Sequence, residues 1–222
     1  MTSNNGKDLI IDGAAGGTIA AALKEDADIV PFEESCFLRK MRTVAPISDE
    51  TVSLLAQHLT PCHFDKRDMV LYAGVFCKYV WFVERGMLRH YWLVDANEVV
   101  TSFSIEGHVI FSMDELYFGE KSQEYAQAVE PIEAYRISVK EMNHLFCTNL
   151  EICNWGRIIH QFEYRRIHQS HQERLTLPAK ERYLMFLREF PEVSRRANLY
   201  DIASYLGITP STLSKLRAKI FE

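Results

Sequence analysis

The feature that most constrains the fold of this chain is a run near its C-terminal end, from Leu199 to Arg217. Its pattern predicts two short helices joined at Gly207, because glycine adopts a left-handed turn that costs other residues energy. Ala203 is small where the helices must cross, and Thr209 and Pro210 suit the N-cap and first turn of the second helix. The apolar residues that would bury one side of each helix are Ile202, Leu206, Ile208, Leu213 and Leu216. The run therefore predicts a helix-turn-helix.

The outward side of the second predicted helix carries hydroxyl groups and cations, which suit the base edges and phosphates of DNA. We expect Ser211 and Lys215 to contact bases, and Arg217 and Lys219 to contact the DNA backbone. A helical hairpin with a solvated polar face is the alternative. The candidate DNA-binding residues are Thr209, Ser211, Thr212, Ser214, Lys215, Arg217 and Lys219.

Charge is divided unevenly along the chain. The formal net charge is −5, which by itself argues against a nucleic-acid binder. From Arg174 onward, however, nine Lys and Arg face five Asp and Glu, a net of +4, whereas the preceding residues carry 16 against 25, a net of −9. Arg195 and Arg196 add positive charge just before the motif. A basic tail on an acidic body is typical of a separate DNA-reading module.

The middle of the chain has a β-rich texture. A capped amphipathic helix is predicted from Ser48 to Leu59. Short β-rich runs separated by turn signals then predict an antiparallel sandwich or barrel. These runs are Met69 to Tyr72, Tyr79 to Val83, Met87 to Val94, Glu98 to Ile105, Val109 to Ser112, Glu124 to Val129 and Ala134 to Ile137.

Helical character follows from Glu141 to about Glu173. An apolar seam on this long helix predicts pairing with a second copy of the chain, and packing on the β domain is the alternative. A further helix is predicted from Ala179 to Phe190, with Pro191 ending it. The seam residues are Leu150, Trp155, Ile158, Ile159 and Phe162, continuing weakly to Ile167.

These patterns divide the chain into four parts. We expect a flexible extension at 1–30, a sensor domain at 31–140, a dimerisation helix at 141–175 and a helix-turn-helix domain at 176–222. No signal peptide or membrane span is visible, which favours a cytoplasmic location. The cysteines are odd in number and form no CxxC pair, so neither a disulfide framework nor a metal site is expected. They are Cys36, Cys62, Cys77, Cys147 and Cys153.

The succession of β-roll, long helix and helix-turn-helix resembles the Crp/Fnr family of bacterial transcription regulators. The resemblance covers about residues 45 to 220. It implies an α+β fold with an N-terminal antiparallel β jelly-roll of the cyclic-nucleotide-binding type, a long dimerisation helix and a C-terminal helix-turn-helix domain. It also implies a homodimer that binds two-fold symmetric DNA. The stretches that carry it are Met69 to Gly74, Tyr79 to Arg89, Glu106 to Ile110, Ala179 to Tyr183, Pro191, and Ile202 to Arg217.

The effector implied by this resemblance is not cyclic AMP. In the members that bind cyclic nucleotides, a Gly-Glu pair and an Arg-Ser pair hold the ribose and phosphate, and neither pair stands at the matching positions here. No arginine lies between Arg89 and Arg136, so the bidentate phosphate clamp is missing. The candidate effector-pocket residues at those positions are Asp114, Glu115, Ser122 and Gln123.

An iron–sulfur cluster and haem fit the sequence to different degrees. The iron–sulfur members carry a cysteine cluster near the N-terminus, and Cys36 alone lies there, which disfavours that sensor. Haem stays a candidate because His and Cys can be axial ligands, although each histidine here is more often structural or solvated. The available histidines are His63, His90, His108, His160, His168 and His171.

Other functions fit the sequence less well, and we expect no enzymatic activity. A cupin-type enzyme would need a His-x-His pair, which the chain lacks. A ligand-binding β-roll protein that senses haem or redox state and acts through protein partners is the main alternative. RNA polymerase is a further candidate partner of a regulator. The sequence ends at Glu222, which leaves no room for a C-terminal β-hairpin wing, so phosphate contacts are expected elsewhere or to be absent.

Overall fold

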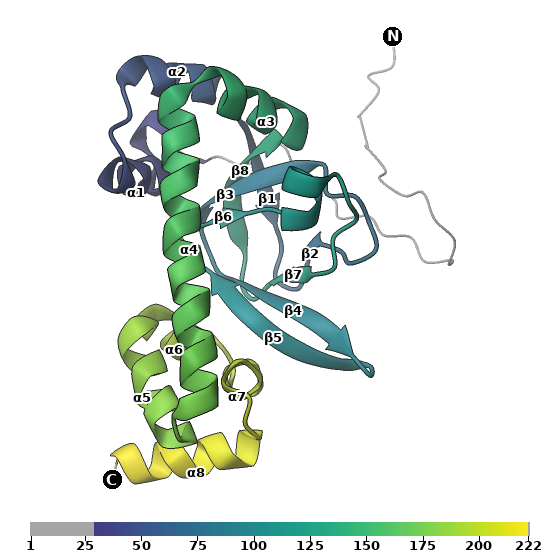
Figure 1. Ribbon diagram of the computed structural model, residues 1–222, viewed down its shortest axis with the longest axis vertical. Helices are drawn as coiled ribbons and strands as arrows, with labels where there is room; N and C mark the ends of the chain where they lie inside the picture. Colours follow the sequence, from purple (N-terminus) through teal and green to yellow (C-terminus); the bar gives the residue numbers. More distant parts are fainter. Residues whose placement is uncertain (1–28, 222) are drawn as a thin grey trace.

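The structure is a computed structural model that describes residues 29–221, so nearly all of the predicted extension at 1–30 lies outside the described residues. One long helix, α4 (Leu150–Thr176), runs along the molecule (Figure 1). The β-strands lie beside it, α1 to α3 gather at its N-terminal end, and α5 to α8 gather at its C-terminal end. Within the described residues, no helix combines the length and apolarity needed to cross a lipid bilayer.

The β-roll consists of two antiparallel four-stranded sheets, as the turn-separated runs predicted. Sheet A has the order β1-β8-β3-β6, and sheet B has the order β2-β7-β4-β5. The sequence did not predict β1, because it contains Pro61, which lacks a backbone N–H and is tolerated at the edge position that β1 occupies. The strands are β1 (Thr60–Phe64), β2 (Met69–Leu71), β3 (Tyr79–Arg85), β4 (Leu88–Val94), β5 (Asn97–Ser104), β6 (Val109–Ile110), β7 (Tyr125–Ala128) and β8 (Ile132–Ser138).

Both faces of sheet A are buried, and each belongs to a different core. Successive side chains of a strand point to opposite faces. Trp81 and Val83 of β3 therefore pack inside the roll, where the core also includes Phe64, Leu88 and Ile110. Val80 and Phe82 face the helices instead. That outer core also contains Phe37, Leu38, Met41, Tyr135, Met142, Ile152 and Trp155.

The helices that cover sheet A begin at side-chain caps. The predicted helix at 48–59 is confirmed as α2 (Asp49–Ala56), which Ser48 caps by accepting a hydrogen bond from the backbone of Thr51. The 3₁₀ turn η1 (Phe32–Glu34) and helix α1 (Cys36–Val44), which Ser35 caps, were not predicted. The buried apolar residues of α1 are Phe37, Leu38 and Met41, which pack in the outer core.

The predicted helical stretch after Glu141 is two helices rather than one. Helix α3 (Val139–Thr148) ends at Asn149, whose backbone is extended and whose side chain accepts a hydrogen bond from the Ile152 N–H at 2.9 Å. An asparagine at such a position satisfies a backbone donor that would otherwise be unpaired, so it starts a new helix. A π-helical turn, η2 (Asp114–Phe118), also lies close to α3.

The prediction that Trp155 belongs to an exposed seam of α4 is wrong, because Trp155 is 3% exposed and lies in the outer core. Ile158 and Ile159 also pack against that core, so this side of α4 follows the alternative of packing on the β domain. Leu150 and Phe162 are exposed, at 83% and 58%. The helical period places Leu150 on a different side of α4 from Trp155.

The C-terminal module, residues 179–221, contains four helices. They are α5 (Ala179–Glu189), α6 (Pro191–Arg196), α7 (Leu199–Leu206) and α8 (Pro210–Phe221). The helix predicted at 179–190 is confirmed. Pro191 does end it, but it also occupies the first position of α6, which was not predicted. Proline fits a first helical position because its missing N–H has no partner there in any case.

Candidate nucleic-acid interface

The turn between α7 and α8 has the geometry that the sequence predicted. Gly207 has a φ of 65° and closes α7, and the N–H of Ile208 donates to the carbonyl of Ala203 at 3.0 Å. No atom lies within 4 Å of the position where a Cβ on Gly207 would stand, so the left-handed backbone, rather than crowding, requires glycine. Thr209 caps α8 by accepting a hydrogen bond from the N–H of Thr212, with Pro210 as the first helical residue.

The inner sides of α7 and α8 share one core with α5, α6 and part of sheet B. Ala203 and Leu213, one from each helix of the motif, are fully buried there. This packing fixes the crossing of the two helices and therefore fixes which side of α8 faces outward. The other buried members of this core are Met87, Tyr91, Val100, Tyr183, Phe186, Val193, Ile202, Tyr205 and Leu206.

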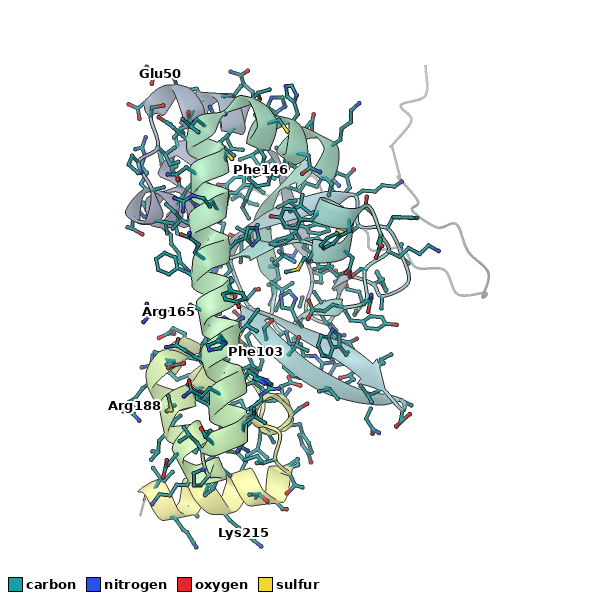
Figure 2. The ribbon with its side chains drawn as sticks, viewed as in Figure 1. Glu50, Phe103, Phe146, Arg165, Arg188 and Lys215 are labelled. Atoms are coloured by element: carbon teal, nitrogen blue, oxygen red, sulfur yellow. The ribbon has the colours of Figure 1, made fainter. Side chains whose placement is uncertain are left out.

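The outward side of α8 is a polar and basic surface. Figure 2 shows Lys215 pointing away from the rest of the molecule. The hydroxyl of Thr209 lies 3.0 Å from that of Ser211 and 2.8 Å from that of Thr212, so three of the predicted residues form a cluster at the start of α8. The exposed members of the predicted set are Thr209, Ser211, Thr212, Ser214, Lys215 and Lys219, and together they form the α8 surface.

Two of the predicted basic residues are engaged within the module or with the β-roll. Arg217 is half-buried and donates to the hydroxyl of Tyr183 at 3.0 Å. Arg196 does not supplement the basic surface as expected, because its guanidinium donates to Glu106 at 2.8 Å and also binds Glu130. The sequence could not reveal this pairing, since the two acidic residues lie far from Arg196 along the chain.

The ion pair with Arg196 changes the pKa of Glu106. Burial alone would raise the pKa of Glu106. Hydrogen bonds from Arg196 and from the N–H of Gly86 outweigh burial, so the pKa of Glu106 lies below its ordinary value. The Glu106 carboxylate is therefore ionised near neutral pH when the module is docked on the roll.

A second group of polar contacts joins α7 to the β4–β5 hairpin. Arg89 of β4 binds Asp201 of α7 at 2.9 Å and Glu98 of β5 at 2.5 Å. The hydroxyl of Ser204 accepts a hydrogen bond from the N–H of Val100 at 2.9 Å and donates to the carbonyl of Glu98 at 3.2 Å. Helix α7 thus occupies part of the free edge of β5, and α8 stays on the far side of α7 (Figure 1).

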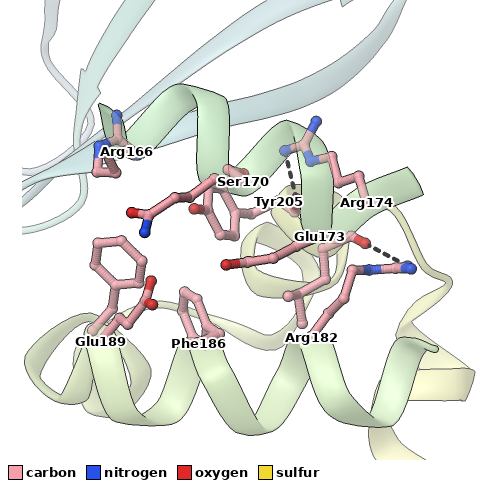
Figure 3. A pocket seen from close by; sticks show the side chains of 11 residues that line it. Arg166, Ser170, Glu173, Arg174, Arg182, Phe186, Glu189 and Tyr205 are labelled. Atoms are coloured by element: carbon pink, nitrogen blue, oxygen red, sulfur yellow. Dashed lines mark hydrogen bonds between the residues drawn. The ribbon is translucent and has the colours of Figure 1, made fainter. Parts of the chain in front are cut away.

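Polar contacts also connect the C-terminal end of α4 to the module. Arg174 donates to the carbonyl of Tyr205 at 2.9 Å, and Arg182 of α5 donates to that of Leu206 at 3.1 Å. An open hollow of about 460 Å³ separates α4 from α5 here. Figure 3 shows Glu173 and Glu189 projecting into it. Burial and the negative charge of Glu189 raise the pKa of Glu173, so the two carboxylates repel each other across the hollow.

The four residues predicted for the effector pocket lie around one loop of the β-roll. Asp114 accepts a hydrogen bond from the N–H of Gln123 at 3.0 Å, which brings the two halves of the predicted set together. Ser122 is buried, and its hydroxyl bonds to the backbone of Glu124. One carboxylate oxygen of Glu115 is buried with no hydrogen-bond partner among residues 29–221. None of these four residues lines the hollow between α4 and α5, and none lines a second hollow beneath the N-terminal half of α4.

The histidines proposed as haem ligands are scattered, and several are engaged. His90 contacts Ser104 at 2.9 Å through one ring nitrogen and Glu124 at 3.4 Å through the other. His63 pairs with Asp65, and His160 is hydrogen-bonded to the hydroxyl of Tyr117. His168 and His171 are exposed on α4. Within the described part of the chain, no three His, Cys, Asp or Glu side chains are grouped as metal ligands.

His108 has a different environment. Burial first, and then the charges of Lys40 and Arg166, lower the pKa of His108 to about 3. The imidazole is therefore neutral at pH 7. A neutral imidazole is the form in which a histidine binds a metal.

Comparison with solved structures shows the fold of this chain. FixK2 from Bradyrhizobium japonicum superposes with a TM-score of 0.62 at 20% identity, covering 73% of this chain and 84% of FixK2. The c-di-GMP-responsive global regulator CLP from Xanthomonas campestris gives 0.61 at 16% identity, over 78% of this chain and 91% of CLP. A regulator of the Crp/Fnr family from Eubacterium rectale gives 0.62 at 14% identity, over 77% and 82% of the two chains.

The chain therefore has the fold of the Crp/Fnr regulators, with a β-roll of the cyclic-nucleotide-binding type followed by a helical C-terminal domain. This outcome confirms the predicted fold class. No protein-family model matches the sequence, and no curated protein sequence matches it.

Proposed function

We propose that this chain is a sequence-specific DNA-binding transcription regulator of the Crp/Fnr type, which reads the major groove with α8. The observation that carries the proposal is the α8 surface, because its hydroxyls and lysines are exposed while the opposite side of the same helix is buried against α7. Donors and cations on a protruding helix suit base edges and phosphates. The similar structures include regulators, which supports the same function.

Selection of DNA from a pool of randomised duplexes tests this function. The purified chain should enrich a two-fold symmetric sequence whose half-sites are about one helical turn apart, since paired recognition helices enter successive major grooves. Lys215→Ala should enrich it weakly or not at all, whereas Lys140→Ala, which removes an exposed lysine from α3, should behave as the unchanged chain. A pool that stays random with the unchanged chain would remove the proposal.

The proposed partner besides DNA is a second copy of the chain, bound along α4. Three apolar side chains share the side of α4 opposite Trp155: Tyr164, Ile167 and Leu175 are 75%, 55% and 73% exposed. Their three- and eight-residue spacing makes one stripe along the helix. We propose this stripe, in place of the predicted seam, as the contact between the two copies, because most of the seam residues face the chain's own core.

The oligomeric state distinguishes the stripe from the predicted seam. Tyr164→Glu, which alters a residue of the stripe that is not part of the predicted seam, should convert a dimer to a monomer in sedimentation analysis, because a charge would be buried in an apolar contact. Phe162→Glu alters an exposed residue on the side of Trp155 and should leave the dimer intact. If Phe162→Glu is the change that dissociates the dimer, the assignment of the stripe is wrong.

We expect the effector to be a molecule other than cyclic AMP. The interior of the roll is filled by apolar side chains including Phe64, Trp81 and Leu88, and Ser122 is engaged with its own loop. Calorimetric titration with cyclic AMP should show no heat of binding. Haem sensing is the second candidate because burial keeps the imidazole of His108 neutral at pH 7, and a Soret band that shifts in His108→Gln would support it.

A further inference from the structure

A hollow of about 300 Å³ lies beneath the N-terminal half of α4, outside the β-roll. Its floor is the outer face of sheet A, where Val80 and Val109 contribute side chains, and the neighbouring Trp81 and Ile110 point into the roll instead. Helices α3 and α4 form its walls. The remaining lining residues are Phe111, Leu116, Tyr117, Met142, Phe146, Trp155, Gly156, Ile159 and His160.

One polar group in this lining has no partner. Trp155 is 3% exposed, and no acceptor among residues 29–221 receives a hydrogen bond from its indole N–H. The rings of Phe37 and Phe82 pack edge-on against Trp155, at centroid distances of 5.9 and 6.3 Å, and hold the indole in place. A buried donor without an acceptor is unusual and indicates that a group outside the chain completes it.

The rim of the hollow is a contact between the β-roll and α4. The hydroxyl of Tyr117, from η2, is hydrogen-bonded to Nε2 of His160. Burial raises the pKa of Tyr117 to about 12 and lowers the pKa of His160, so near neutral pH the phenol keeps its proton and the imidazole is uncharged. Phe111 packs edge-on against both rings. The hollow is therefore bounded by neutral groups, with an aromatic pair at its mouth.

Phe146 and Gly156 set the width of the hollow. A Cβ on Gly156 would stand 2.7 Å from the ring of Phe146, so any larger residue in this position would displace that ring. Glycine within a helix is unfavourable compared with alanine, and its presence here keeps the ring close against α4.

We propose that this hollow binds a small neutral carbonyl compound with an apolar body, whose oxygen accepts the hydrogen bond from the indole N–H of Trp155. A charged ligand is disfavoured because no Lys, Arg, Asp or Glu lines the hollow. The hollow is small and partly open to solvent, so the ligand is small. The site does not depend on DNA binding, and it stands or falls separately from the proposed function.

Acetophenone and α-methylstyrene are matched probes for this site, because they have nearly the same shape and differ in the carbonyl oxygen. In ¹H–¹⁵N spectra of the full chain, acetophenone should cause a saturable shift of the Trp155 indole resonance, assigned with Trp155→Phe. α-Methylstyrene should bind about fivefold more weakly, as expected for the loss of one hydrogen bond. The resonance of Trp92, which is exposed on the β4–β5 hairpin, should not move.

Two variants sharpen the test. Trp155→Phe keeps an aromatic ring but removes the donor, so the two probes should bind it equally, as followed by saturation-transfer NMR of the probes. Gly156→Ala pushes the Phe146 ring and should weaken both probes together, while Trp92→Phe should change nothing. The proposal is overturned if acetophenone fails to shift the Trp155 resonance, or if both probes bind the unchanged chain with the same affinity.

Discussion

The two ends of α4 are attached to the rest of the molecule in different ways. At the N-terminal end, Ile152 and Trp155 are buried in an apolar core that continues across sheet A. At the C-terminal end, Arg174 and Arg182 donate to backbone carbonyls beside an open hollow. Interlocked apolar packing has one arrangement and resists change, whereas exposed polar contacts exchange with water at little cost. We therefore expect the C-terminal module to reorient more readily than the helices that cover sheet A.

The contacts between the module and the β-roll also include both apolar packing and ion pairs. Met87, Tyr91 and Val100 of the roll do contribute to the core of the module. Around these apolar residues, however, ion pairs join Arg89 to Asp201 and Arg196 to Glu106. A switch that moves the module would have to break these ion pairs, and it would leave the outer core intact.

The largest expected effect comes from removing the apolar anchor at the N-terminal end. Trp155→Ala should lower the free energy of unfolding by about 3–5 kcal/mol, because a large buried ring leaves a cavity. Phe162→Ala, on the same side of α4 but exposed, should change it by no more than about 0.5 kcal/mol. Urea denaturation measures both, and equal effects would mean that Trp155 does not anchor α4 in the outer core.

The next effect concerns pH. The pKa of His108 is lowered to about 3 in the folded chain, so the unfolded chain binds this proton at a higher pH. The free energy of unfolding should therefore fall as pH drops from about 6.5 toward 3, by about 1 kcal/mol per pH unit. Denaturation at pH 7, 6 and 5 should show a shallower decline in His108→Gln, and an unchanged slope would show that His108 is not buried as described.

The ion pairs at the module should produce a smaller and local effect. Arg196→Ala should speed hydrogen exchange at the Val100 amide, which Ser204 protects, by about fivefold, because a partly exposed pair contributes up to about 1 kcal/mol. Exchange at Phe82 in sheet A should be unchanged. Arg195→Ala is the matched control, since Arg195 pairs with Glu192 within α6. Equal acceleration at Phe82 would indicate global destabilisation instead of local undocking.

An effect of about the same size is expected at the turn of the motif. Gly207→Ala should cost about 1 kcal/mol, because alanine is strained at a φ of 65°. Gly207→Asn should cost less, since asparagine tolerates this conformation better. Thermal unfolding of the two variants gives the comparison, and equal melting temperatures for all three chains would contradict the turn geometry.

The sequence predicted the features that depend on local pattern. Short β-rich runs between turn signals located seven of the described strands, and the combination of Ala203, Gly207 and Thr209 located the motif, because each of these signals arises within a few residues. What it missed depends on tertiary structure. Trp155 fits an exposed seam and a buried core equally well by spacing, and only the position of sheet A decides between them.

In the candidate DNA-binding site, too, the sequence predicted what depends on local pattern and missed what depends on tertiary structure. The exposed side of α8 follows from its apolar spacing, so Ser211 and Lys215 could be placed in advance. The pairing of Arg196 with Glu106 joins residues 90 positions apart, and no local pattern reports it. The hollow beneath α4 likewise combines side chains from sheet A, η2, α3 and α4.

The salt dependence of DNA affinity tests the central claim most directly. On the duplex obtained by selection, the logarithm of the association constant should fall linearly with the logarithm of salt concentration, and Lys215→Ala should weaken binding at every salt concentration by about 1–3 kcal/mol. Lys140→Ala should follow the unchanged chain. If Lys215→Ala and Lys140→Ala bind DNA with the same affinity and the same salt dependence, α8 is not the DNA-reading helix.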